Sequence, residues 1–105
     1  MDLELKGKRA LVVGASRGLG YAVATALAAE GVHVAINSRN AEKLSTAAKQ
    51  IEAAYGIAVP VAAADISDAD APQKVVAKTV ESLNGLDLLV TNAGGPPPGP
   101  FESFS

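Results

Sequence analysis

The sequence contains no cysteine and no tryptophan, and only one of its 105 residues is a histidine. Without cysteine there can be no disulfide and no thiolate metal site, and a single histidine cannot build a zinc site alone. No apolar run approaches the roughly 20 residues that a membrane-spanning helix needs. The opening residues, MDLELKGKR, alternate in charge and do not resemble a signal peptide. We therefore expect a cytoplasmic protein with no metal site and no membrane contact.

The bulk composition is that of one small globular domain. Apolar residues make up 49% of the chain and charged residues 19%, which is typical of a folded protein and not of a disordered one. The formal net charge of −2 gives no reason to expect a nucleic-acid partner.

Short apolar stretches alternate with stretches of helical periodicity along the whole chain. RALVVG, VHVAINS, IAVPVAAAD and LDLLVTN have the apolar, β-branched character of buried strands. Strands of this kind separated by helices predict a parallel α/β sheet in three layers, α/β/α. Pro60 cannot donate a ladder hydrogen bond, so its strand, the third, belongs at a sheet edge. The order 3-2-1-4 meets this condition and places the first two helices on one face and the third on the other.

Each predicted helix has an apolar stripe and a stop signal. Asn40 is a plausible N-cap of the second helix, Gly56 is expected to end it, and Gly85 is expected to end the third. The predicted buried stripes, in chain order, are Leu19, Ala22, Val23, Ala26 and Leu27; Leu44, Ala47, Ala48, Ile51 and Tyr55; and Val76, Val80 and Leu83.

A glycine-rich loop, GASRGLG, joins the first strand to the first helix. We expect Gly14 to permit a tight turn, Gly18 to let the backbone approach a ligand, and Gly20 to let the helix pack closely on the sheet. The loop lies where the chain reverses its direction across the sheet, and the helix that follows presents free amides at its positive end. That arrangement suits a pyrophosphate. The spacing G-x-x-x-G-x-G differs from both the G-x-G-x-x-G fingerprint and the P-loop.

The second strand ends in Ser38 and Arg39, where dinucleotide folds that bind NAD have an acidic residue for the ribose 2′-hydroxyl. A carboxylate would repel a 2′-phosphate, whereas a guanidinium binds it through paired hydrogen bonds. With Arg17 in the loop on the same side, the residues favour NADP(H) over NAD(H). The alternative is that both arginines are ordinary solvated side chains.

At this point the chain resembles the classical short-chain dehydrogenase/reductase family, whose fold is of the Rossmann type. GASRGLG is similar to its cofactor loop, AADIS to its adenine-binding segment, and TNAG to its Asn-Asn-Ala-Gly motif. Val13 and Thr91 depart from the family's Thr and first Asn, and we expect these departures to compensate for each other. The resemblance implies that Asp65 meets the adenine amino group. The implied cofactor-binding residues are Gly14, Ser16, Arg17, Gly18, Leu19, Gly20, Ser38, Arg39, Asp65, Ile66, Asn92, Ala93 and Gly94.

The family's catalytic Ser, and its Tyr and Lys spaced Tyr-x-x-x-Lys, have no match in this chain. Tyr21 is followed four residues later by Thr25, and Tyr55 by Val59. We therefore expect residues 1–105 to be the cofactor-binding half of an enzyme whose catalytic residues lie beyond Ser105.

The sequences GASRGLG and NSRN resemble the 3-oxoacyl-carrier-protein reductase-like branch. This implies reduction of a small carbonyl, or oxidation of a secondary alcohol, in a homotetramer. The alternatives are a nucleotide-binding module or regulator without catalytic activity, and a structural fragment that binds nothing tightly.

Overall fold

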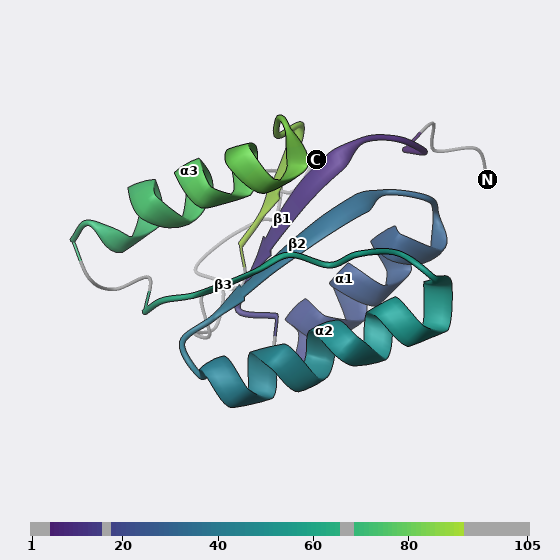
Figure 1. Cartoon of the computed structure of the whole chain (residues 1–105), viewed down its shortest axis with the longest axis horizontal. Helices are drawn as coiled ribbons and strands as arrows, with labels where there is room; N and C mark the ends of the chain where they lie inside the picture. Colours follow the sequence, from purple (N-terminus) through teal and green to yellow (C-terminus); the bar gives the residue numbers. More distant parts are fainter. Residues whose placement is uncertain (1–4, 16–17, 66–68, 92–105) are drawn as a thin grey trace, which may run out of the picture.

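The computed structural model describes residues 5–15, 18–65 and 69–91, and strands alternate with helices along this part of the chain. The strands form one parallel sheet in the order β3-β2-β1-β4, with α1 and α2 on one face and α3 on the other (Figure 1). The predicted three-layer architecture and strand order are confirmed. The elements are β1 (Arg9–Val13), α1 (Gly18–Ala29), β2 (His33–Ser38), α2 (Ala41–Tyr55), β3 (Val61–Ala63), α3 (Ala71–Leu83) and β4 (Leu88–Val90).

The apolar core has one part on each face of the sheet, because successive side chains of a strand point to opposite faces. On the face that α1 and α2 cover, Val12 and Ile36 pack in one cluster with Leu44 of α2. On the other face, Leu11 packs in a second cluster with Val75 of α3. Both faces of the central strands are buried, which is why these strands are nearly continuous apolar runs.

Helix α2 begins and ends where the sequence predicts. The Asn40 side chain accepts a hydrogen bond from the Lys43 amide at 2.9 Å, and Gly56 adopts the left-handed conformation at the C-cap. Leu44, Ala47, Ala48 and Ile51 are buried as expected, whereas Tyr55, at the last position of the helix, is 39% exposed.

The buried face of α1 agrees with the prediction in part. Val23 and Leu27 pack against the core as expected, but the fully buried residues are Gly20, Ala24 and Ala28, and Leu19 is 69% exposed. Small residues occupy the buried face of α1 because they let the helix axis approach the strands closely. The helix carries no charged residue, so its apolar character runs round both sides and its periodicity did not single out the buried one. No helix within the described residues is long and apolar enough to cross a membrane.

The prediction for α3 is also confirmed in part. Val76 and Leu83 pack against the core as expected, but the helix fully buries Ala71, Val75 and Thr79 and leaves Val80 41% exposed. It ends one residue earlier than expected, because Asn84, and not Gly85, takes the left-handed C-cap position. Strand β3 lies at the edge of the sheet as predicted, but it begins at Val61, so Pro60 precedes the strand and does not lie inside it as expected. The Pro60 carbonyl accepts a hydrogen bond from the Ile36 amide at 3.0 Å.

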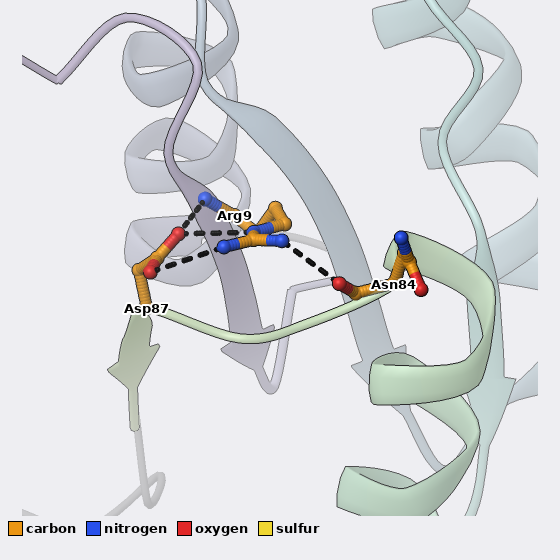
Figure 2. Close-up of polar contacts among 3 residues, drawn as sticks. All are labelled: Arg9, Asn84 and Asp87. Carbon is orange, nitrogen blue, oxygen red and sulfur yellow. Dashed lines mark hydrogen bonds and ion pairs between the residues drawn. The ribbon is translucent and has the colours of Figure 1, made fainter.

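An ion pair fastens the amino end of β4 to the amino end of β1. The Arg9 guanidinium lies 3.1 Å from Asp87 through Nε and donates at 2.8 Å to the Asn84 carbonyl through Nη1 (Figure 2). The Arg9 amide also donates to the Asp87 carboxylate, and the Asp87 amide donates to the Arg9 carbonyl. These contacts hold the start of β4 in register with β1 at the amino ends of the strands, which is the end of the sheet opposite Gly14.

The Arg9 contacts give the pH dependence of stability a predictable sign. The hydrogen bonds from the Arg9 side chain and amide lower the pKa of Asp87 below its ordinary value. A lowered carboxyl pKa contributes stability that is present above the unfolded-state pKa, about 4, and is lost as the pH falls through the folded-state value. We expect Asp87→Asn to lower the melting temperature modestly at pH 7 and to flatten its decline below about pH 4.

Thermal unfolding measured by circular dichroism between pH 2 and pH 7 tests this expectation. Glu81→Gln is the matched control, because Glu81 is exposed and forms no ion pair within the described residues. An Asp87→Asn profile that runs parallel to that of the wild type at all pH values would show that the ion pair contributes nothing.

Candidate functional site

The carboxyl ends of the parallel strands bring three of the predicted site residues to one edge of the sheet. Gly14 follows β1, Ser38 ends β2, and Asp65 lies just beyond β3. Backbone hydrogen bonds join these ends: the Ala15 amide donates to the Asn37 carbonyl at 2.8 Å, and the Ala64 amide donates to the Ser38 carbonyl at 3.0 Å. This edge is where doubly wound sheets bind ligands.

Two of the predicted glycines stand at the described ends of the connection between β1 and α1. Gly14 has a φ of 74° and Gly18 a φ of 66°, both in the left-handed region that glycine occupies without strain. Helix α1 begins at Gly18 and has no acidic residue in its first turn. Its positive end therefore meets no negative charge from its own first turn, which leaves that end favourable for a phosphate group.

Gly20 has a different role, because it makes the packing of α1 possible. A Cβ at this position would overlap the Gly14 carbonyl oxygen and lie 2.9 Å from the Gly14 carbonyl carbon and 3.1 Å from the Ala15 Cα. All three are backbone atoms, which cannot move aside as a flexible side chain would. The predicted close packing at Gly20 is confirmed, and its direct neighbour is the turn that leaves β1.

Ser38 and Arg39 differ in how far they are available to a ligand. Ser38 is only 7% exposed, and its Oγ accepts a hydrogen bond from the Asn40 amide at 3.3 Å. Arg39 is exposed and forms no ion pair within the described residues. It stands two residues before the start of α2, whose positive end adds to the local potential. The guanidinium is therefore the better placed of the two for an anionic ligand.

Asp65 is half-buried and lines a hollow of about 470 Å³ between β3 and α3. Asp70, Lys74 and Lys78 line the same hollow, whose remaining wall is mostly alanine. Its size is within the range of small-molecule sites, although it is open to solvent on one side. No group of three or more His, Asp or Glu side chains placed to hold a metal occurs in the described part of the chain.

Several predicted site residues lie outside the described ranges. The cofactor-binding roles of these residues stay predictions, and so does the expectation that Arg17 and Arg39 lie on the same side of the site. These residues are Ser16, Arg17, Ile66, Asn92, Ala93 and Gly94.

The two departures from the family pattern lie on neighbouring strands. Val12 of β1 pairs with Val90 of β4, so the next positions in the same register are Val13 and Thr91. Val13 is buried and Thr91, just after β4, is exposed. Their predicted proximity is consistent with this register.

One residue of this edge was missed by the sequence reasoning. Asn37 is 1% exposed and donates hydrogen bonds to two carbonyl oxygens of the neighbouring chain segment. The available signal was a polar residue, directly before the end of β2, in a run that is otherwise apolar.

Comparison with known proteins identifies relatives of this chain. The family model described as short chain dehydrogenase matches residues 8–105. Glucose 1-dehydrogenase of Gluconobacter oxydans (strain 621H) is 42% identical over 98 residues, which are 93% of this chain and 37% of that protein. Gluconate 5-dehydrogenase of the same organism is 43% identical over 101 residues, 96% of this chain and 39% of that protein.

The fold agrees with the sequence relationship. The crystal structure of L-sorbose reductase from Gluconobacter frateurii, complexed with NADPH and L-sorbose, superposes with a TM-score of 0.86 at 33% identity. The match covers 95% of this chain and 38% of that structure. The chain thus spans about two-fifths of the length of the relatives it matches.

The packing at Gly20 predicts a difference between two glycines of the same loop. We expect Gly20→Ala to lower the free energy of unfolding by about 1–3 kcal/mol, because the added methyl overlaps backbone atoms. Gly18→Asn is the control: a Cβ at position 18 meets nothing within 4 Å, and Asn tolerates the left-handed conformation. We expect it to change stability by less than about 1 kcal/mol. Urea unfolding measures both, and equal losses would refute the distinction.

The register of Val13 with Thr91 predicts that the two positions are energetically coupled. We expect a double-mutant cycle built from Val13→Thr and Thr91→Asn to give a coupling energy above about 0.5 kcal/mol in urea unfolding, because the paired side chains can restore a hydrogen bond that neither forms alone. Additive effects of the two substitutions would contradict the idea that these departures compensate for each other.

Proposed function

The chain belongs to the short-chain dehydrogenase family, and we propose that it is the NADP(H)-binding half of an oxidoreductase that reduces a carbonyl or oxidises a secondary alcohol. The observation that carries the cofactor assignment is the end of β2. No carboxylate stands there, and the exposed Arg39 guanidinium has no ion-pair partner in the described residues. A 2′-phosphate supplies the negative charge that such a guanidinium binds, whereas a 2′-hydroxyl does not.

The other described residues fit a dinucleotide laid along the same edge of the sheet. The first amides of α1, behind Gly14 and Gly18, suit the pyrophosphate. Asp65 would accept a hydrogen bond from the adenine amino group, in the role that the family resemblance implies. When bound, the cofactor supplies the hydride chemistry, and these residues bind it and set its orientation.

The tyrosines of this chain give no reason to place catalysis within it. Tyr21 is half-buried and packs against the core on the α1 side, and Tyr55 is the last residue of α2. Neither has a lysine four residues later. We propose that the Ser, Tyr and Lys that handle the substrate proton are supplied by sequence outside these 105 residues, and that the 105 residues alone are inactive.

The substrate is proposed only as a class. The names of the relatives refer to glucose, gluconate and L-sorbose, which supports a small polyhydroxylated carbonyl or alcohol. Membership of the 3-oxoacyl-carrier-protein reductase-like branch and the tetramer stay predictions from the resemblance, and the cytoplasmic location stays a prediction from the sequence composition.

The assignment to Arg39 predicts the cofactor preference and how to reverse it. We expect the protein to bind NADPH at least tenfold more tightly than NADH, a difference of about 1.4 kcal/mol. Arg39→Asp should abolish or reverse this preference, because the new carboxylate repels the 2′-phosphate and can accept from a 2′-hydroxyl. Isothermal titration calorimetry with both cofactors measures the ratio.

Lys49→Asp is the matched control, because it makes the same charge change at an exposed position in the middle of α2, away from the end of β2 where Arg39 stands. It should leave the ratio unchanged. An unaltered ratio in Arg39→Asp would refute the role of Arg39, and the absence of binding by either cofactor would refute the proposed function itself.

A further inference from the structure

Asn37 is a polar side chain inside an apolar layer. Its neighbours in register are Val13 on β1 and Ala62 on β3, and both belong to the core cluster beneath α3. Burying an amide is unfavourable unless its hydrogen bonds are replaced. At Asn37 they are replaced at one place, the carboxyl end of β3.

The Asn37 amide continues the sheet past the last residue of β3. Its Nδ2 donates to the Ala62 carbonyl oxygen at 2.7 Å and to the Ala64 carbonyl oxygen at 3.2 Å. Because both neighbours are acceptors, the amide must present its nitrogen to them. The Ala64 amide donates to the Ser38 carbonyl at 3.0 Å, so both backbone groups of Ala64 are bonded to β2.

This arrangement sets the position of the following residue. The Ala64 carbonyl and the Asp65 amide belong to one planar peptide unit, so a hydrogen bond that fixes the carbonyl also fixes the direction in which Asp65 leaves the sheet. On its other side, the Asn37 carbonyl accepts from Ala15, next to the glycine turn. Asn37 therefore connects the segment that bears Asp65 to the segment proposed to bind phosphate.

We infer that Asn37 is a positioning residue of the nucleotide site, which holds the peptide between Ala64 and Asp65 so that the Asp65 carboxylate meets the adenine amino group. The inference rests on the proposed function, in which Asp65 has that role. It adds that base recognition depends on a buried side chain of β2 that does not touch the ligand.

The test compares NADPH with nicotinamide hypoxanthine dinucleotide phosphate, in which a carbonyl oxygen replaces the adenine amino group. The wild-type full chain should bind NADPH at least tenfold more tightly than this analogue, because the analogue presents an acceptor to the Asp65 carboxylate. In Asn37→Ala the ratio should fall below threefold, while both nucleotides still bind through their phosphates. The substitution leaves the main-chain bond to Ala15 in place.

Thr79→Ala separates positioning from general stability. Thr79 is also buried on the α3 side of the sheet, but its hydroxyl bonds to Val75 of its own helix at 2.8 Å. This variant should lose stability and keep the wild-type ratio. If Asn37→Ala weakens the binding of both nucleotides by the same factor and so keeps the ratio of their affinities, Asn37 is only structural and the inference is overturned. A wild-type ratio near one refutes the role of Asp65, and with it this inference, whatever Asn37 does.

A measurement on the wild type keeps the inference testable if Asn37→Ala does not fold. The side-chain amide signal of Asn37 in nitrogen–proton NMR spectra should shift on addition of NADPH and of AMP. It should not shift on addition of nicotinamide mononucleotide, which lacks the adenine. An Asn37 signal that NADPH leaves unmoved overturns the inference.

Discussion

The contact between Gly20 and the turn after β1 is the constraint on which the candidate site depends. Because position 20 has no Cβ, the first turn of α1 rests directly on the backbone of Gly14 and Ala15. A helix that started farther from the strand would not direct its first amides to the carboxyl edge of the sheet. The close packing of α1 thus depends on one missing methyl group, and the small residues Ala24 and Ala28 extend the same close approach along the helix.

The amino and carboxyl ends of the parallel strands differ in their polar contacts. At the amino edge, Arg9 and Asp87 lock β4 to β1 with both side-chain and main-chain hydrogen bonds. At the carboxyl ends, Asn37 and Ser38 are buried, Asp65 is half-buried and Arg39 is exposed. The parallel register brings these residues, which lie far apart in the chain, to the same end of the sheet. The Asn37 side-chain amide adds two hydrogen bonds from β2 to the end of β3.

The sequence predicted the order of the strands, the sides on which the helices lie and the caps of α2, because strand runs, Asn40, Gly56 and Pro60 are local signals. It predicted only part of the buried faces of α1 and α3, since Val23, Leu27, Val76 and Leu83 pack against the core but the fully buried residues of both helices lay outside the predicted stripes. Helix α1 is apolar on all sides, so hydropathy does not distinguish its faces. The face that is buried is the one whose small residues allow the closest approach to the sheet. In α3, Thr79 lies on the buried face, where the hydrogen bond from its hydroxyl to the Val75 carbonyl offsets the cost of burying it, which hydropathy does not reveal.

By itself the sequence determined the family, the parallel sheet and the position of the glycine turn, because these follow from residue order, periodicity and the conformational freedom of glycine. Only the tertiary structure decided that position 20 faces the backbone of Gly14 and Ala15, that Ser38 turns its hydroxyl to the Asn40 amide, and that Asn37 bonds to the end of β3. Each of those roles is a contact between segments or a direction of a side chain. Such contacts are fixed by the packing of the whole sheet, and no local pattern of residues records them.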